Sequence, residues 1–172
     1  MSKAGKFAGA AVVMGVASCG KTAVGKAIAE LLDVPFTEGD RLHPSANIAK
    51  MSAGVPLTDE DRWPWLELVG QSLRGAEGAL TSCSALKRAY REHIAGTAGR
   101  PVSFVLLDGR RAVLERRILE RKGHFMPASL LESQLATLER PGPDECALRL
   151  DIEMPVEFLA AEAAHWLLKG TD

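Results

Sequence analysis

The sequence predicts an α/β domain of three layers, in which helices cover a parallel sheet of five strands. Two observations carry this prediction. An apolar run at residues 10–14 is followed at once by a glycine-rich loop and then by apolar residues at helical spacing. Strand-like and helix-like segments then alternate to residue 168, which is the order that builds a parallel sheet.

The composition is that of an ordinary globular protein. The 172 residues suit one domain, and we expect a single domain over residues 1–172. With 21 Lys and Arg against 22 Asp and Glu, no overall positive field attracts nucleic acid or an anionic membrane. Three widely spaced cysteines (Cys19, Cys83 and Cys146) indicate reduced thiols. We therefore expect a cytoplasmic protein without nucleic-acid or membrane partners.

Residues 15–22 read Gly-Val-Ala-Ser-Cys-Gly-Lys-Thr and fit the G-x-x-x-x-G-K-[ST] pattern of loops that hold nucleotide phosphates. The glycines let backbone N–H groups converge, and the following helix directs its positive dipole end at the same point. Lys21 can neutralise phosphate oxygens, and the Thr22 hydroxyl can bind Mg²⁺. The expected nucleotide contacts of this stretch are Gly15, Val16, Ala17, Ser18, Cys19, Gly20, Lys21, Thr22 and Ala23.

Cys19 permits two further interpretations. Lys3, Lys6 and an apolar run ending at Cys19 imitate a bacterial lipoprotein signal, but the run is short, rich in alanine and interrupted by glycine. Cleavage there would also cut through the phosphate-loop motif, so we favour the loop. Its position beside Lys21 and at the start of a helix could make Cys19 a reactive thiolate. The alternative is an inert small residue packed under the loop.

A brief strand is expected at residues 34–37, ending in Glu38-Gly39-Asp40. The carboxyl ends of strands face the ligand crevice in an open α/β sheet, and residues two apart in an extended chain point the same way. One carboxylate could reach Mg²⁺ while the other orients and deprotonates an attacking hydroxyl. An acidic turn around a glycine is the alternative interpretation.

The next two segments are predicted helices. The first begins at Pro44 and ends before Gly54. In it His43, Asn47 and Lys50 share one face, which suits a hydroxylated, anionic small molecule or is simply a solvated face. In the second, Thr58 and Asp61 form a helix cap that leaves Arg62 in the first turn. Its core-facing residues are expected to be Trp65, Leu66, Val69 and Leu73.

The second half of the chain continues the alternation. Residues 79–82 form a third strand with few β-branched residues, and residues 102–108 form the clearest strand. We expect Asp108 to begin the turn Asp108-Gly109. Arg117 and Arg121 are expected on one face of a basic helix. A helix over 127–140, a last strand over 146–152 and a final helix up to residue 168 follow, with Val156 and Leu168 on its apolar face.

Together these segments resemble the gluconokinase family, in the shikimate-kinase-like branch of the nucleoside-monophosphate-kinase fold. The resemblance rests on the loop 15–22, on residues 39–44, 47, 50–51 and 56–66, and downstream on residues 83–91, 121–125 and the spacing of Gln134, Thr137, Leu138, Glu139 and Pro141. It extends from about Val12 to Ile152. Ser18-Cys19 departs from the small Ser-Gly or Gly-Ser pair usual in the family.

The resemblance implies a P-loop kinase fold with strand order 2-3-1-4-5 and a mobile lid over roughly residues 110–130. The implied reaction is ATP-dependent phosphorylation of D-gluconate at its 6-hydroxyl, with Mg²⁺, and with gluconate as the small-molecule partner. A homodimer is compatible with it. A kinase of the same fold acting on shikimate or another small polyol acid, or a regulator that only binds nucleotide, remain the alternatives.

The resemblance also implies roles for single residues. The catalytic residues would be Lys21, Asp40 and Arg121, with Thr22 and Glu38 at the metal. Arg117 would flank the adenine, and Pro155 would lie near it. The substrate contacts would be Asp40, His43, Asn47, Lys50, Arg62, Ser84, Lys87, His124 and Gln134, among which Arg62 would hold the carboxylate.

Overall fold

The computed structural model describes residues 5–75, 77–121 and 128–170. These residues contain a parallel sheet in the order β2-β3-β1-β4-β5, which confirms the expected strand order. The strands are β1 (Ala10–Met14), β2 (Phe36–Glu38), β3 (Ala79–Ser82), β4 (Val102–Asp108) and β5 (Ala147–Asp151).

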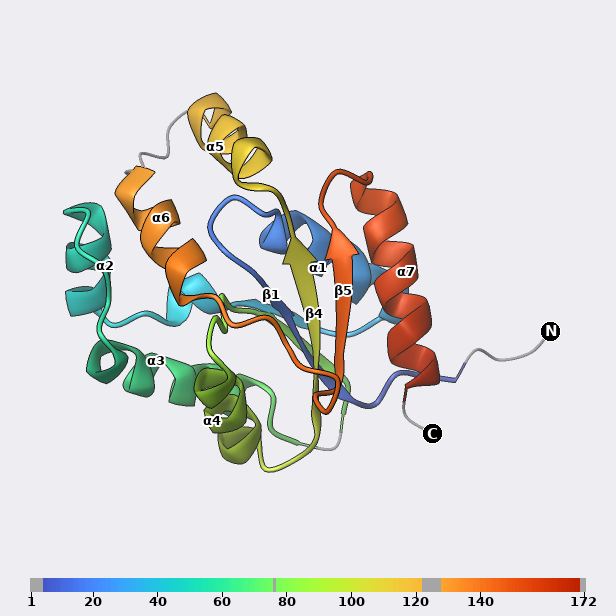
Figure 1. Cartoon of the computed structure of the whole chain (residues 1–172). Helices are drawn as coiled ribbons and strands as arrows, with labels where there is room; N and C mark the ends of the chain where they lie inside the picture. The colour runs from blue at the N-terminus through green and yellow to red at the C-terminus, as the bar shows by residue number, and fades with distance from the viewer. Residues whose placement is uncertain (1–4, 76, 122–127, 171–172) are drawn as a thin grey trace.

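Helices cover both faces of the sheet, with α1 and α7 packed together on one side and α3 and α4 on the other (Figure 1). The helices are α1 (Lys21–Leu32), α2 (Ser45–Ser52), α3 (Asp59–Ser72), α4 (Arg88–Ala98), α5 (Arg111–Glu120), α6 (Ala128–Thr137) and α7 (Val156–Lys169), with a short 3₁₀ turn η1 (Gly39–Leu42) after β2. Among the residues described, no helix is both long and apolar enough to cross a membrane.

The central strand explains why the phosphate loop is held firmly. All five residues of β1 are buried between β3 and β4, as the apolar run predicts.

Two hydroxyl side chains of strand β3 form hydrogen bonds with neighbouring segments. The hydroxyls of Ser72 and Thr81 are hydrogen-bonded at 2.8 Å, and Ser82 Oγ accepts a bond from the backbone N–H of Gly39 at 3.2 Å. Burying a hydroxyl group costs little free energy when the group has a hydrogen-bond partner. Strand β3 can therefore be buried although two of its four residues, Thr81 and Ser82, are polar.

Helix α3 begins as the sequence predicts. Thr58 and Asp61 form a complete capping box, and the predicted core residues of this helix are buried. Trp65 Nε1 donates to the carbonyl oxygen of Gly39 at 2.8 Å, which joins α3 to the end of β2. A side chain at Gly39 would meet the carbonyl oxygen of Ser82 at 1.9 Å, so only glycine fits between the two strands.

Several expected boundaries are wrong by a few residues. The second strand occupies Phe36–Glu38 rather than residues 34–37, and Pro44 caps α2 instead of being its first residue. Helix α6 spans only Ala128–Thr137 of the predicted 127–140, and Pro127 lies outside the described residues. Val156 and Leu168 are each 39% exposed, because they lie at the two ends of α7, where the apolar face leaves the core.

Candidate active site

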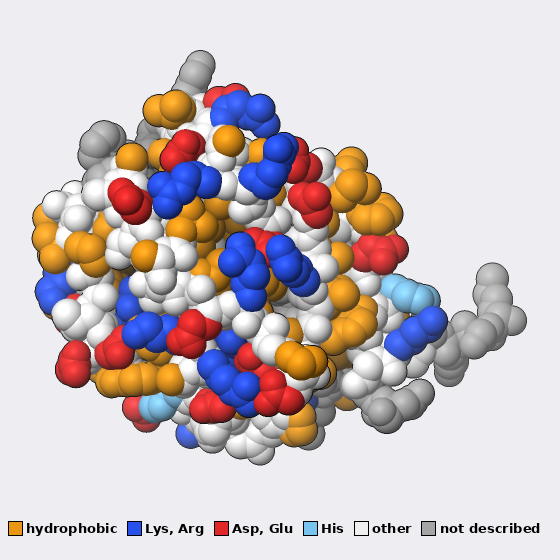
Figure 2. Space-filling view, in the orientation of Figure 1, with side chains coloured by type: hydrophobic (Ala, Val, Ile, Leu, Met, Phe, Trp, Pro, Cys, Tyr) orange, Lys and Arg blue, Asp and Glu red, His pale blue; other side chains and the backbone are white. Residues whose placement is uncertain are grey.

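A cleft of about 950 Å³ opens beside the phosphate loop. The space-filling view shows this face of the molecule hollowed, with basic side chains next to the opening (Figure 2). Most of the sequence-predicted site residues line it, namely Ala17, Ser18, Gly20, Lys21, Thr22, Ala23, Glu38, Asp40, His43, Arg62, Ser84, Arg117, Arg121 and Gln134. Its volume lies in the range of small-molecule sites.

The phosphate loop has the geometry that its motif predicts. Gly15 and Gly20 adopt φ values of +147° and +97°, and a side chain at Gly15 would meet Leu107 O at 2.8 Å. Lys21 Nζ donates to the carbonyl oxygens of Gly15 and Val16, each at 3.0 Å. The ammonium group thus lies over the loop, at the start of α1, where the helix dipole also favours an anion.

Thr22 and Glu38 meet at the end of the cleft next to the phosphate loop. The hydroxyl of Thr22 donates to Glu38 Oε1 at 2.5 Å. Both side chains offer oxygen, the ligand that Mg²⁺ prefers. The described residues contain no group of three or more His, Cys, Asp or Glu side chains that could hold a metal by themselves. This donor set therefore fits Mg²⁺ that completes its shell with phosphate oxygens and water.

Asp40 also lines the cleft, but the sequence-based expectation that it points the same way as Glu38 because both lie in an extended chain is wrong. Asp40 lies in the 3₁₀ turn η1 rather than in an extended chain, so it does not follow the alternation of β2. The turn nevertheless brings Asp40 to the same cleft as Glu38, because Glu38 is the last residue of β2 and Asp40 lies two residues after it.

His43 packs against the indole of Trp65, with the ring centroids 3.9 Å apart. Burial lowers the pKa of His43 to about 4, against the opposing effect of the Asp40 charge. The imidazole is therefore neutral at neutral pH. A neutral ring offers a hydrogen-bonding group to a polyol without adding charge to the cleft.

Asn47, Lys50 and Lys87 do not line the cleft. Asn47 Nδ2 donates to the carbonyl oxygen of Asp61 at 2.9 Å, and Lys50 Nζ pairs with the Asp61 carboxylate at 2.7 Å. Lys87 Nζ lies 3.4 Å from Asp59 Oδ1. The shared face of α2 therefore fastens α2 to the start of α3 in this structure.

Residues from the second half of the chain contact the phosphate loop. Arg117 donates to the backbone oxygens of Ile152 at 2.8 Å and Cys19 at 3.4 Å. Gln134 Oε1 accepts a bond from the backbone N–H of Ala17 at 2.7 Å. Arg121 lines the cleft but lies just past the end of α5, so it does not share a helix face with Arg117.

Pro155 is not among the residues that line the cleft. Pro155 caps α7, and its neighbour Val156 lines the cleft in its place. His124 lies outside the described residues.

Relatives among known proteins are similar in sequence to this protein over nearly the whole chain. The gluconokinase of Gluconobacter oxydans (strain 621H) is 51% identical over 155 residues, which cover 88% of this chain and 86% of that protein. The thermosensitive gluconokinase of Escherichia coli (strain K12) is 45% identical over 163 residues, covering 91% of this chain and 86% of its own. The chain belongs to the gluconokinase family. No family model matches it.

Solved structures agree with this assignment. A gluconokinase from Sinorhizobium meliloti 1021 superposes with a TM-score of 0.87 at 48% identity, over 95% of this chain and 93% of that chain. Shikimate kinase from Bacteroides thetaiotaomicron superposes with a TM-score of 0.65 at 17% identity, over 92% of this chain and 98% of its own. This second similarity concerns the fold alone.

Cys19 is an interior residue in this gluconokinase-family chain. Its side chain is 1% exposed, and burial raises the pKa of the thiol although Lys21 and Arg117 lie near it. Between a reactive thiolate and an inert residue packed under the loop, the structure favours the inert residue.

Sequence reasoning missed several residues of the cleft and its surroundings. Ser133 of α6 lines the cleft. Tyr90 and Asp59 do not line it, but they contact Arg62, which does. Tyr90 lies within residues 83–91, which carry part of the family resemblance, but the sequence does not reveal its contact with Arg62, because the two residues are 28 positions apart.

Proposed function

We propose that this protein transfers a phosphoryl group from ATP to the 6-hydroxyl of D-gluconate, giving 6-phospho-D-gluconate and ADP. The observation that carries the proposal is that one cleft joins the phosphate loop to Asp40 and Arg62. A carboxylate acceptor and a nucleotide can therefore meet in it. The gluconokinases to which the chain is similar support gluconate as the acceptor.

At the nucleotide end, we assign the phosphate contacts to the backbone of the loop and to Lys21. Thr22 and Glu38 would hold Mg²⁺, which neutralises phosphate charge when bound. Phosphoryl transfer is accelerated mainly by positioning and by neutralising charge, and the Lys21 ammonium supplies both at the loop. Arg121 would add charge at the transferring group, and Arg117, held by Ile152 O, would flank the adenine.

At the acceptor end, we assign Asp40 to the 6-hydroxyl. Its carboxylate would orient the hydroxyl and accept its proton as the new bond forms. Arg62 would hold the acceptor carboxylate with two parallel hydrogen bonds, as guanidinium groups do. Neutral His43, and Ser84 at the end of β3, would face the hydroxyls between these two ends. We expect the enzyme to work in the cytoplasm as a single domain.

A coupled ADP-release assay over a panel of acceptors tests the proposal. D-gluconate with ATP and Mg²⁺ should give turnover well above the rate without acceptor, and shikimate and neutral polyols should not. Preference for another polyol acid would replace the acceptor but keep the reaction. Nucleotide binding without turnover for any acceptor would favour a regulator and overturn the proposal.

A further inference from the structure

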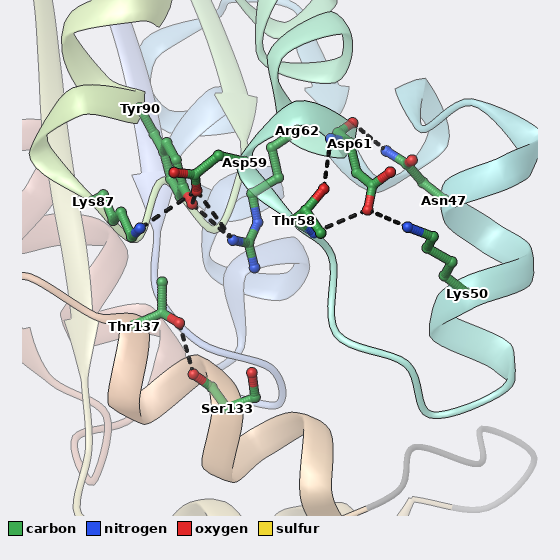
Figure 3. A network of polar contacts seen from close by, with 10 residues as sticks. All are labelled: Asn47, Lys50, Thr58, Asp59, Asp61, Arg62, Lys87, Tyr90, Ser133 and Thr137. Carbon is green, nitrogen blue, oxygen red and sulfur yellow. Dashed lines mark hydrogen bonds and ion pairs between the residues drawn. The ribbon is translucent and has the colours of Figure 1, made fainter.

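Arg62 reaches the cleft at the end of a chain of polar contacts that joins α3 to α4 (Figure 3). Arg62 Nη1 donates to the Tyr90 hydroxyl at 2.7 Å. That hydroxyl donates to the Asp59 carboxylate, and Lys87 Nζ donates to the same carboxylate oxygen at 3.4 Å. Tyr90 is 1% exposed and Arg62 is 9% exposed. Hydrogen bonds between such shielded groups are stronger than those made in water.

The direction of these hydrogen bonds is fixed by Asp59. An ionised carboxylate can only accept, so the single hydroxyl proton of Tyr90 lies toward Asp59 and its oxygen lone pairs are left for Arg62. The bond from Tyr90 lowers the pKa of Asp59, and burial with the bond to Asp59 raises the pKa of Tyr90. Both groups therefore keep these roles at neutral pH.

This arrangement leaves one edge of the Arg62 guanidinium for a ligand. In the close view, Arg62 extends from α3 toward α6, with one terminal nitrogen at Tyr90 and the other directed away from it (Figure 3). The guanidinium carbon also lies 5.2 Å from the centroid of the Tyr90 ring. A guanidinium binds a carboxylate well only when its rotation presents two parallel N–H groups. Tyr90 restricts that rotation.

The charges of the network suit the same ligand. The cations Arg62 and Lys87 share one carboxylate, that of Asp59, while the neighbouring Asp61 is paired with Lys50 at 2.7 Å. Within this network one positive charge is left over. An acceptor with a single carboxylate would balance it, whereas a neutral polyol would leave it unpaired in a half-buried place.

We propose that Tyr90, oriented by Asp59, is a positioning residue that sets the rotation of Arg62 and thereby the selectivity for acceptors that carry a carboxylate. The inference rests on the proposed phosphorylation of gluconate and adds the group that determines its selectivity. Tyr90 acts only through Arg62, because Arg62 lines the cleft and Tyr90 does not.

Steady-state kinetics of Tyr90→Phe test the inference. The variant keeps the ring in the core and removes only the hydroxyl. We expect its KM for D-gluconate to rise about tenfold, the usual effect of one lost hydrogen bond to a charged group. Its kcat, its KM for ATP and the inhibition constant of D-glucitol, which lacks the carboxylate, should stay within about twofold of wild type.

Two further measurements separate positioning from loss of structure. Arg88→Gln removes an exposed arginine of the same helix, which pairs with Glu92 and Asp144, and should leave all four constants unchanged. In an Arg62→Lys background, Tyr90→Phe should add little, because the group that Tyr90 orients has already been removed. Equal effects of Tyr90→Phe in both backgrounds would overturn the inference.

Asp59→Asn gives a second test, which is decided by whether KM for gluconate rises or falls. This test remains available even if Tyr90→Phe does not fold. If Asp59 fixes the Tyr90 hydroxyl, its loss frees the proton and KM for gluconate rises. If Asp59 only offsets the nearby positive charge, its loss strengthens anion binding and KM falls, which would overturn the inference. Wild-type protein inactive toward gluconate would instead refute the proposed function. Active wild type with unchanged KM in Tyr90→Phe would refute the inference alone.

Discussion

The side-chain oxygen of Gln134 accepts a hydrogen bond from the backbone N–H of Ala17 at 2.7 Å, which joins α6 to the phosphate loop across the cleft. The two residues are 117 positions apart in the chain. The contact puts Gln134 at the phosphate side, whereas the sequence resemblance assigns Gln134 to the acceptor. Its partner atom belongs to the loop that would hold the nucleotide.

Gln134→Glu should therefore weaken nucleotide binding more than acceptor binding. The new carboxylate would lie against the loop and repel the phosphates, and we expect KM for ATP to rise about tenfold. Gln71→Glu, which adds the same charge at an exposed position near the end of α3, is the matched control. A larger change in KM for gluconate than for ATP would return Gln134 to the acceptor side.

Lys21→Met tests the loop as a catalytic element. We expect turnover to fall on the order of 100-fold or more, because the ammonium that neutralises the transferring phosphoryl group is lost. The free energy of unfolding should change little, since among the described residues Lys21 bonds only to two backbone oxygens of its own loop and to Cys19 Sγ. Near-normal kcat in a folded variant would contradict the mechanism.

Glu38→Gln and Asp40→Asn form a matched pair, since each replaces a carboxylate of the same cleft by its amide. Glu38→Gln should raise the Mg²⁺ concentration needed for half-maximal activity, because Glu38 contacts Thr22 at the metal end. Asp40→Asn should lower kcat at saturating Mg²⁺ with ATP binding intact, because proton transfer is impaired. Titrations of activity against Mg²⁺ distinguish them, and identical Mg²⁺ curves for both variants would disprove the assignment.

His43 predicts a pH dependence of stability. Its pKa is about 4 in the folded protein against 6.5 as the reference value, so the unfolded chain binds more protons between these pH values. Stability should therefore fall as pH drops from 6.5 toward 4, by at most about 3 kcal/mol from this residue. Denaturant unfolding of wild type and His43→Gln across this range measures it, and parallel curves would contradict the assignment.

The three cysteines should react with iodoacetamide in the order of their exposure. Cys146 is exposed and should be labelled first, while Cys19 and Cys83 are buried. Burial raises the pKa of both interior thiols, that of Cys83 to about 12. Mass spectrometry of protein labelled with limiting reagent gives the rates. If Cys19 is instead labelled fast and bound ATP prevents this labelling, the result would support the interpretation of Cys19 as a reactive thiolate.

The sequence was enough for the phosphate loop, for the start of α3 and for the family resemblance, and it was this resemblance that implied the strand order. The loop, the helix start and the family motifs are local patterns: an apolar run before a glycine-rich loop, a capping box at Thr58 and Asp61, and motifs of adjacent residues. Each is specified by neighbours in the chain, because backbone geometry and helix caps depend on nearby residues.

Only the tertiary structure shows which side chains near Arg62 line the cleft and which contact other side chains instead. Asn47 and Lys50 share a helix face, as their spacing requires, yet they bind Asp61 instead of facing the cleft. Tyr90 belongs to a stretch that carries the family resemblance, but the sequence does not show that its hydroxyl contacts Arg62 and Asp59, which lie on a different helix. Spacing fixes which way a side chain points from its own helix. What it meets there depends on how α2, α3 and α4 pack, and that packing is set by the burial of residues far apart in the chain.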